Sequence, residues 1–174
     1  MSSPSSKVNI SIPTARLFSG EPHGMLTPYH RQQQEDRIMT STIIPTMRYD
    51  DAPKMIQWLC DAFGFERRLV VDDGAGKIAH AQLVLGEAMI MLGSTRDDAF
   101  GKLQRTPASL GGTTQSPYII VSEVDSLCET ARAAGAEIVM EPEDQDFGGR
   151  LFSCRDPEGH LWNFGTYNPW TAQD

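Results

Sequence analysis

IPTMRYDD, residues 44–51, is matched 72 positions later by SPYIIVSE, residues 116–123. Each stretch has a proline at its second position and ends in an acidic residue. Gly93 and Gly165 end the two matching segments and are also 72 positions apart. A fixed internal period indicates one supersecondary unit used twice, so the two units can be compared position by position.

The overall composition excludes several classes of function. The chain of 174 residues is 40% hydrophobic, which supports a packed core, and its formal net charge is −8. This charge argues against a nucleic acid or an anionic membrane as partner. No apolar run approaches the about 20 residues of a transmembrane helix. Three scattered cysteines indicate neither a disulfide framework nor a zinc site, so we expect a cytoplasmic protein.

The pattern divides the chain into five segments. Residues 1–41 lack hydrophobic periodicity and are predicted to be a flexible tail; an arm that packs on a partner subunit is the alternative. Residues 42–93 form the first module and 116–170 the second. Residues 94–115, rich in Gly, Ser and Thr, link them, and 171–174 form a short C-terminal tail.

Each module is predicted to have the order βαβββ. In the first, Asp50 or Asp51 begins a helix that Gly64 ends. In the second, Asp125 begins the helix and Gly135 ends it. The predicted strands cover residues 43–49, 65–71, 77–85 and 88–92, then 116–121, 137–140, 150–155 and 161–165. The predicted fold class is therefore α+β, with two tandem βαβββ modules whose mixed sheets form a cup.

The candidate ligand-binding residues follow from strand alternation, because successive residues of a strand face opposite sides of its sheet. Applying the 72-residue offset carries the concave face of the first module onto the second. The resulting set is Thr46, Arg48, His80, Gln82, Met91, Ser116, Tyr118, Arg150, Phe152 and Asn163. Apolar walls with a few polar groups are typical of a small-molecule site. The alternative is a plain core between sheets, in which two arginines and a histidine would be costly to bury unpaired.

Three further features have two interpretations each. His80 is the candidate catalytic acid or base, or else a structural histidine bonded to Gln82 or Tyr118. Cys154 also falls on the concave face by the offset, where a core-filling role is favoured over a nucleophilic one. The acidic segment 141–146 is a solvated loop, or a lid that moves on the glycines after it.

A family resemblance comes from these same residues. The βαβββ repeat, the segment FGGR at 147–150 followed by DPEGHLW at 156–162, and HAQLVLG at 80–86 resemble the vicinal oxygen chelate superfamily. This superfamily includes glyoxalase I, bleomycin-resistance proteins, fosfomycin-resistance proteins and extradiol dioxygenases. The resemblance extends from about Thr42 to Trp170 and is greatest to the PhnB-like, glyoxalase-like branch. It implies the cup-shaped fold and a homodimer, with modules paired within or between chains.

The resemblance also predicts the metal status of the site. Metal enzymes of the superfamily place His, Gln or Glu ligands at strand positions that correspond here to Ile44, Met91, Ser116 and Asn163. These side chains are poor ligands for the divalent ions such enzymes use. We therefore expect no metal cofactor and a small molecule bound in the cup. The alternative is a metal-dependent or His80-assisted lyase, isomerase or dioxygenase acting on a vicinal carbonyl or diol.

Overall fold

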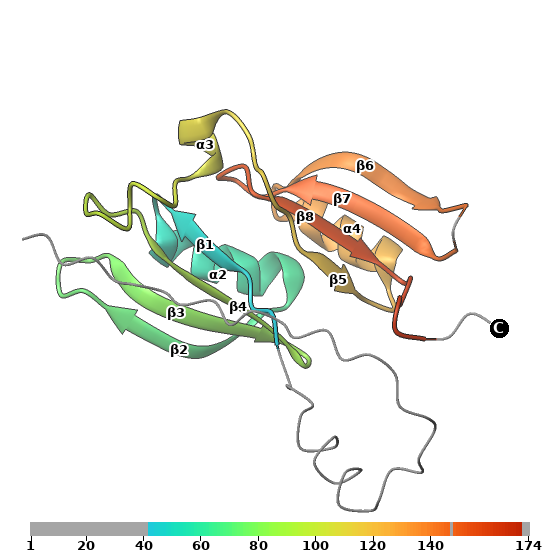
Figure 1. The fold of residues 1–174 in the computed structure, drawn as a ribbon. Coiled ribbons are helices and arrows are strands. Elements are labelled where there is room, and N and C mark those ends of the chain that lie inside the picture. Colours follow the sequence, from blue (N-terminus) through green and yellow to red (C-terminus); the bar gives the residue numbers. More distant parts are fainter. Residues whose placement is uncertain (1–41, 147, 172–174) are drawn as a thin grey trace, which may run out of the picture. The chain divides into compact units, whose positions relative to one another are not determined.

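The protein is described by a computed structural model that covers residues 42–146 and 148–171. The tail predicted at 1–41, and its alternative as a packed arm, lie outside the described residues, as does most of the predicted C-terminal tail. The described part forms two four-stranded sheets with helices packed on them (Figure 1).

The first module has the predicted order of one strand, one helix and three strands. Its elements are β1 (Thr46–Tyr49), α2 (Ala52–Phe63), β2 (Glu66–Asp72), β3 (Ile78–Leu85) and β4 (Ala88–Ser94). The sheet order is β1-β4-β3-β2, in which β1 runs parallel to β4 and the other pairs are antiparallel. The strands β1, β4 and β3 are therefore neighbours, and side chains on their shared face meet.

The second module repeats this arrangement. Its elements are β5 (Tyr118–Ile120), α4 (Val124–Ala133), β6 (Glu137–Asp144), β7 (Arg150–Arg155) and β8 (Leu161–Gly165), in the sheet order β5-β8-β7-β6. Only the short helix α3 (Pro107–Leu110) interrupts the linker between the modules. The repeated sheet order confirms the predicted α+β fold of two tandem βαβββ modules.

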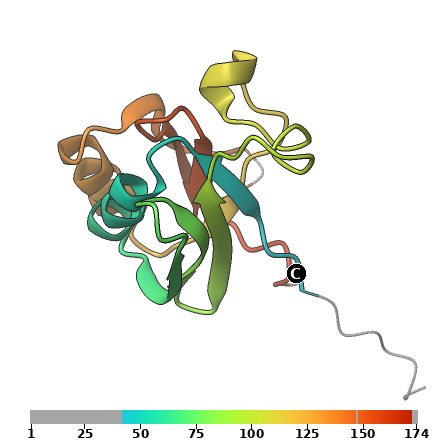
Figure 2. The ribbon, with the colours of Figure 1, turned by 90° about the vertical axis from the view of Figure 1, so that its left-hand side faces the viewer.

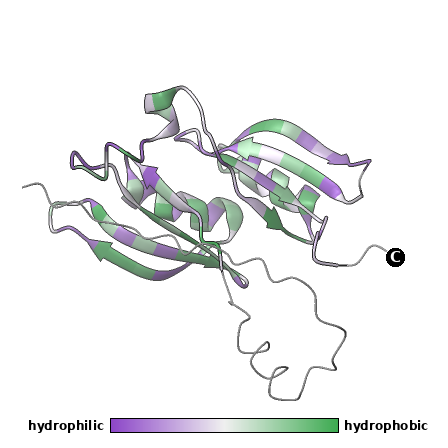
Figure 3. Ribbon diagram, in the orientation of Figure 1, coloured by the Kyte–Doolittle hydropathy of each residue, from purple (hydrophilic) through white to green (hydrophobic). Residues whose placement is uncertain are grey.

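Strand alternation in the first module is largely as predicted. Ala81, Leu83, Ile90 and Leu92 are buried under the helix, and hydrophilic bands separate hydrophobic ones along β3 (Figure 3). The exception is the start of β3, where Ile78 is buried and Ala79 is exposed. The register between β2 and β3 shifts at this point, which reverses the two faces.

Helix α2 begins and ends at the signals found in the sequence. The Asp51 side chain caps it by accepting a hydrogen bond from the Lys54 N–H at 3.2 Å, and a proline occupies the first turn. Gly64 ends it at φ 78°, a left-handed conformation that glycine adopts without a Cβ clash. Its buried face consists of Ala52, Met55, Ile56, Leu59, Ala62 and Phe63.

The prediction that Asp125 caps the second helix is wrong. The residue preceding α4 is Glu123, whose side chain makes no capping hydrogen bond, and Asp125 lies in the first turn. There the Asp125 carboxylate binds Arg150 with two hydrogen bonds of 2.8 Å. A negative charge in the first turn still interacts favourably with the positive end of the helix dipole.

The two modules share one hydrophobic core. Helices α2 and α4 lie side by side (Figure 2), and Trp58 Nε1 donates a hydrogen bond to the Ala134 carbonyl at 2.7 Å. The Phe63 ring centroid lies 5.2 Å from that of Trp162 and 4.7 Å from that of Phe164. Since Trp162 and Phe164 are fully buried, neither module has a complete core without the other.

The turn between β7 and β8 docks onto the first module. Buried Asp156 accepts a hydrogen bond of 2.7 Å from the Tyr49 hydroxyl. The Glu158 carboxylate accepts hydrogen bonds from the N–H groups of residues 50–51 at 2.6 and 2.8 Å, just before α2 begins. The turn at residues 156–159 therefore also stabilises the start of α2.

The 72-residue offset holds for β4 and β8 but fails for β3 and β7. Gln82 pairs with Met91, nine positions away, whereas Ser153 pairs with Asn163, ten positions away. The second hairpin thus has one extra residue between matched positions, and Gln82 corresponds to Ser153, 71 positions later. A shift of one residue moves every side chain of a strand to the opposite face, which changes the predicted lining of the second module.

The loop predicted at 141–149 is shorter than expected, because β6 continues to Asp144. Gln145 N–H donates to the Gly149 carbonyl and Gly148 N–H donates to the Gln145 carbonyl, both at 2.8 Å. Gly149 has φ 80°, and a Cβ at this position would lie 2.8 Å from Tyr167 N. These bonds and the close packing of Gly149 argue against a mobile lid.

Within the described ranges, no helix has the length and hydrophobicity to span a membrane.

Candidate ligand-binding site

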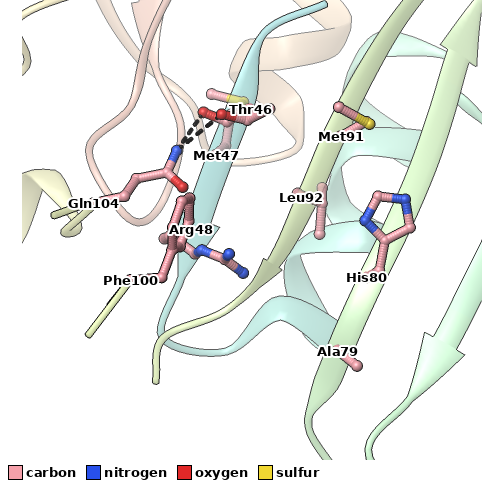
Figure 4. Close-up of a pocket in the computed structure, with 9 residues that line it drawn as sticks. All are labelled: Thr46, Met47, Arg48, Ala79, His80, Met91, Leu92, Phe100 and Gln104. Carbon is pink, nitrogen blue, oxygen red and sulfur yellow. Dashed lines mark hydrogen bonds between the residues drawn. The ribbon is translucent and has the colours of Figure 1, made fainter. Parts of the chain in front are cut away.

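The concave face of the first module contains a cavity of about 110 Å³. Strands β1, β3 and β4 and the linker after β4 contribute its lining (Figure 4). The lining residues are Thr46, Met47, Arg48, Ala79, His80, Met91, Leu92, Phe100 and Gln104. None of these side chains is acidic, although the chain as a whole has a net charge of −8. The cavity is therefore a locally positive region of an acidic protein.

Four of the predicted ligand-binding residues meet in this cavity: Thr46, Arg48, His80 and Met91. Gln82 lies next to them, with its Nε2 3.3 Å from His80 Nε2. Because Gln82 contacts one ring nitrogen of His80, the other is left on the side of the ring that faces Arg48 (Figure 4). An imidazole held in this way can exchange a proton or a hydrogen bond with a molecule in the cavity.

The position of Arg48 is defined by a glycine and an aromatic ring. A Cβ at Gly93, the β4 residue paired with Arg48, would lie 2.5 Å from Arg48 Nη1, so only glycine leaves room for the guanidinium there. The Arg48 Cζ atom lies 5.4 Å from the centre of the Phe100 ring, within the range of a cation–π interaction. Phe100 comes from the linker, so the linker completes the cavity wall.

The Arg48 guanidinium is poorly satisfied within its own chain. It has five N–H donors, yet its one hydrogen bond to a described residue joins Nη1 to the Ser94 carbonyl at 3.5 Å. Its Nε is buried and has no hydrogen-bond partner. Burial lowers the pKa of Arg48, as does the nearby Arg96 guanidinium, while Asp98 acts in the opposite direction. Leaving a buried charged donor unpaired costs about 1–3 kcal/mol or more.

A second cation lies near Arg48. The Arg96 Cζ atom is 5.8 Å from the centre of the same Phe100 ring. Arg96 has a partner of its own, because its Nε donates to Asp98 at 2.6 Å. A hydrogen bond from the Gly101 N–H, together with Arg96, lowers the pKa of Asp98. Asp98 thus pairs with Arg96, and Arg48 is left without a carboxylate partner among the described residues.

Gln104 fastens the linker to the first strand. Its Nε2 donates to the Thr46 carbonyl at 2.8 Å and to Thr46 Oγ1 at 3.1 Å. Neither Gln104 nor Phe100 was predicted to line the site, because the segment rich in Gly, Ser and Thr was interpreted as a linker without a binding role. The available signal was Phe100 itself, the sole aromatic residue among 94–115.

A neighbouring cavity of about 220 Å³ extends the site along the linker, and Thr46, Arg48 and Gln104 line both spaces. His160, from the turn before β8, is part of its wall. The His160 ring contacts the Arg48 carbonyl through Nε2 at 2.9 Å and lies 4.6 Å from the Tyr49 ring. This histidine therefore supports the backbone of the strand that carries Arg48.

The second-module candidates do not reach this cavity. Ser153 Oγ donates to Asn163 Oδ1 at 2.8 Å, and Asn163 Nδ2 donates to Ser116 Oγ at 2.9 Å. The Tyr118 hydroxyl donates to the Tyr167 carbonyl at 2.9 Å. The polar groups of this concave face therefore satisfy one another.

The placement of Phe152 on the concave face is wrong. Phe152 is fully buried and pairs with Phe164, with the two ring centroids 5.2 Å apart. Cys154 pairs with Trp162 on the same helix-covered face, and burial raises the pKa of its thiol to about 12. Ser153 takes the concave position instead, as the one-residue shift requires.

The placement of Arg150 on the concave face is also wrong. Its Nε and Nη2 bind Asp125 of α4, and its Nη1 donates to Asp144 at 3.1 Å. These two carboxylates raise the pKa of Arg150. Arg150 therefore joins the sheet to the helix.

The sequence matches the Glyoxalase/Bleomycin resistance protein/Dioxygenase superfamily over residues 36–164. The chain belongs to this superfamily. The narrower resemblance to its PhnB-like branch stays a prediction.

Several known proteins are similar to this chain. An uncharacterized protein of Mycobacterium tuberculosis (strain ATCC 25618 / H37Rv) is 34% identical over 137 residues, which cover 77% of this chain and 81% of that protein. The crystal structure of TioX from Micromonospora sp. ML1 is 31% identical, with a TM-score of 0.59, and the match covers 74% of this chain and all of TioX.

A mutant of the fosfomycin resistance protein FosX from Listeria monocytogenes, solved with Mn(II) and 1S,2S-dihydroxypropylphosphonic acid, has a TM-score of 0.56. It is 18% identical and the match covers 76% of this chain and 94% of FosX. At this identity the likeness shows the fold.

The metal site of superfamily enzymes has no suitable donor set here. Of the corresponding positions Ile44, Met91, Ser116 and Asn163, the last offers a carbonyl oxygen, and that oxygen already accepts a hydrogen bond from Ser153. In the part of the chain that the structure describes, no three His, Cys, Asp or Glu side chains gather in a way that could hold a metal ion. The residues present therefore do not fit a catalytic divalent metal.

Proposed function

We propose that this protein binds a small molecule in the first-module cavity without a metal ion. The observation that carries the proposal is Arg48, a fixed and under-satisfied guanidinium that borders two adjoining cavities. Native proteins rarely leave such a group unpaired. The two cavities together slightly exceed the lower limit of about 300 Å³ for small-molecule sites. Their mixed lining, with Met91 and Phe100 beside polar groups, also suits an organic ligand.

A thermal-shift screen tests this proposal. Purified protein in EDTA would be screened against a diverse small-molecule library, and hits would be repeated with His80→Ala and with the exposed-surface variant Arg68→Met. A ligand at one hundred times its Kd stabilises a protein by about 2.7 kcal/mol. We expect hits that weaken in His80→Ala and are unchanged in Arg68→Met. The proposal would be contradicted if mass spectrometry found stoichiometric Zn²⁺, Ni²⁺, Mn²⁺ or Fe²⁺ in the protein and if library compounds raised the melting temperature only of the metal-loaded protein.

A second candidate function is catalysis assisted by His80. It is favoured by the geometry in which Gln82 holds one ring nitrogen and the other faces Arg48. Arg48 would stabilise negative charge while His80 moves a proton. Turnover of a vicinal carbonyl or diol compound by wild-type protein, abolished in His80→Gln, would establish this function in place of simple binding.

We also propose that the protein acts as a homodimer. The concave face of the second module leaves apolar side chains open, with Tyr118 39% exposed and Ile120 45% exposed. Burying such side chains against a second copy would be favourable by about 25 cal/mol per Å². Light scattering should give twice the chain mass for the wild type and a smaller mass for Ile120→Glu. A monomeric wild type would contradict the proposal.

A further inference from the structure

We infer that the ligand of the first-module cavity carries an oxyanion, of the carboxylate or phosphonate type, that pairs with Arg48. This inference rests on the proposed small-molecule function and names the chemical class of the ligand. Its basis is a charge imbalance around one aromatic ring, which no described residue of the chain corrects.

The imbalance arises from the linker after β4. Phe100 brings two guanidinium groups to one ring, Arg48 at 5.4 Å and Arg96 at 5.8 Å. The Asp98 carboxylate is bound to Arg96 at 2.6 Å, and no carboxylate forms an ion pair with Arg48 among the described residues. One positive charge of this group therefore has no partner among the described residues, and it is the charge that faces the cavity.

The arginines of the second module differ from Arg48 in this respect. In the second module each arginine pairs with a carboxylate: Arg132 with Glu141, Arg150 with Asp125, and Arg155 with Glu137. Those pairs are exposed and easily formed in a chain with 23 acidic residues. Arg48 is the half-buried exception, although carboxylates are abundant elsewhere on the surface.

Contacts on several sides hold Arg48 in the cavity wall. Gly93 makes room for Nη1 beneath it, Phe100 covers its face, and the Nη1 contact to Ser94 holds one edge. The guanidinium end points across β4 toward His80 (Figure 4). An oxyanion between them would accept hydrogen bonds from Arg48 and from the free ring nitrogen of His80. Charge-assisted bonds of this kind are about twice as strong as neutral ones.

Other ligand charges fit less well. A cationic group would face two guanidinium groups and would be repelled. A neutral carbonyl would satisfy one Arg48 donor and leave the charge of Arg48 uncompensated. The chemistry of the cavity therefore selects for negative charge, and the half-buried Met91 and the Phe100 ring in its wall accommodate an apolar body attached to it.

The test compares probes that differ in charge but not in shape. Calorimetric titration at constant ionic strength would measure benzoate, its neutral isostere benzamide, and inorganic phosphate against the full-length protein. Wild type, Arg48→Met, Arg48→Lys and Arg96→Met would be compared with Arg68→Met, which removes an exposed arginine of β2 that has no described partner. Circular dichroism would establish that each variant is folded.

We expect benzoate or phosphate to bind wild type at millimolar concentration or better, and benzamide to bind at least about tenfold more weakly. Arg48→Met should bind the anion at least about tenfold more weakly than wild type, and Arg96→Met should weaken binding by a smaller factor. Arg68→Met should bind the anion as tightly as wild type. Partial retention by Arg48→Lys would show that charge contributes in addition to guanidinium geometry.

The outcomes separate the two proposals. Equal binding of benzoate and benzamide, or anion binding unchanged in Arg48→Met, would overturn the oxyanion inference while leaving small-molecule binding intact. The inference also fails if neither anion binds but a neutral library compound does so in a His80-dependent way. If no library compound and no probe binds, the proposed function itself fails.

Discussion

The two modules share a sheet order but differ in how the polar groups on their concave faces are hydrogen-bonded. In the second module, Ser153, Asn163 and Ser116 bond to one another, so little hydrogen-bonding capacity is left for a ligand. In the first, Arg48 has one long hydrogen bond, and the cavity beside it is lined by a histidine with one nitrogen free. The first module therefore has the capacity to bind, and the second is internally satisfied.

The glycines that end the two modules show how the same scaffold supports both outcomes. A Cβ at Gly93 would lie 2.5 Å from Arg48 Nη1, and a Cβ at Gly165 would lie 2.5 Å from the Tyr118 hydroxyl. Each glycine makes space for a large polar side chain of the first strand of its module. The scaffold is repeated, and the identity of the side chain in that space decides whether a cation or a phenol faces the cup.

The strongest test of the comparison concerns Phe152 and His80, which the 72-residue offset makes equivalent. Phe152→Ala should lower the free energy of unfolding by about 3–5 kcal/mol, because the ring is fully buried against Phe164. His80→Ala should cost less than about 1 kcal/mol, because His80 lies at an accessible cavity. Urea unfolding of both variants measures the difference. Equal losses of unfolding free energy would mean that Phe152 and His80 lie on the same face of their sheets and that the 71-residue correspondence is incorrect.

A second test uses pH and the core position of Cys154. Burial raises the pKa of this thiol to about 12, above its unfolded value of about 8.5. A raised folded pKa gives stability that is complete below about pH 8.5 and is lost as pH rises toward 12, by up to about 1.4 kcal/mol per pH unit.

The matched variant is Cys154→Ala, which keeps the buried Tyr49 and every other titrating group. Its free energy of unfolding should fall less steeply than that of wild type above about pH 9. Urea unfolding at a series of alkaline pH values gives both slopes. Parallel slopes would show that Cys154 is solvated in the folded protein, and iodoacetamide should then label it readily.

The terminal glycines provide a third test with a built-in control. Gly93→Ala and Gly165→Ala should each lower the free energy of unfolding by about 1–3 kcal/mol, because the added methyl group meets a backbone carbonyl at about 3 Å in both places. Only Gly93→Ala displaces Arg48, so it alone should weaken benzoate binding. A loss of binding in Gly165→Ala of the same size would show that the two concave faces form one site.

The smallest effect is expected for Arg150→Met. The guanidinium is paired with Asp125 and Asp144 on the side facing the helix, and both pairs are exposed to solvent. Exposed ion pairs contribute little, so the melting temperature should change slightly and benzoate affinity should equal that of wild type. If Arg150→Met weakens anion binding as much as Arg48→Met does, Arg150 lies in the site after all.

Sequence patterns predicted the local structure well where the signal is short-range. The cap at Asp51, the stop at Gly64 and the buried face of α2 depend on residues within one helix. The concave residues of the first module were also found, because its β3–β4 hairpin has a short turn that preserves the strand register. The candidates Arg48, His80 and Met91 follow from that register.

The same procedure failed in the second module for a specific reason. One extra residue between Ser153 and Asn163 reverses the faces of β7, so Phe152 and Arg150 were assigned to the wrong side. A repeat period read at β4 and β8 contains no information about an insertion inside the hairpin. Comparing the lengths of the two hairpins, rather than their ends, would have revealed it.

The sequence by itself determined the repeated βαβββ unit, the limits of α2 and the superfamily, because these depend on periodicity and on residues close together in the chain. Only the tertiary structure decided which polar side chain is left without a partner. Gln104 reaches Thr46, Glu158 reaches the start of α2, and Asp125 takes Arg150, all across long separations in sequence. Hydrogen bonds and ion pairs form between whichever groups the fold brings together, so the unsatisfied Arg48 becomes evident only when every other partner is in place.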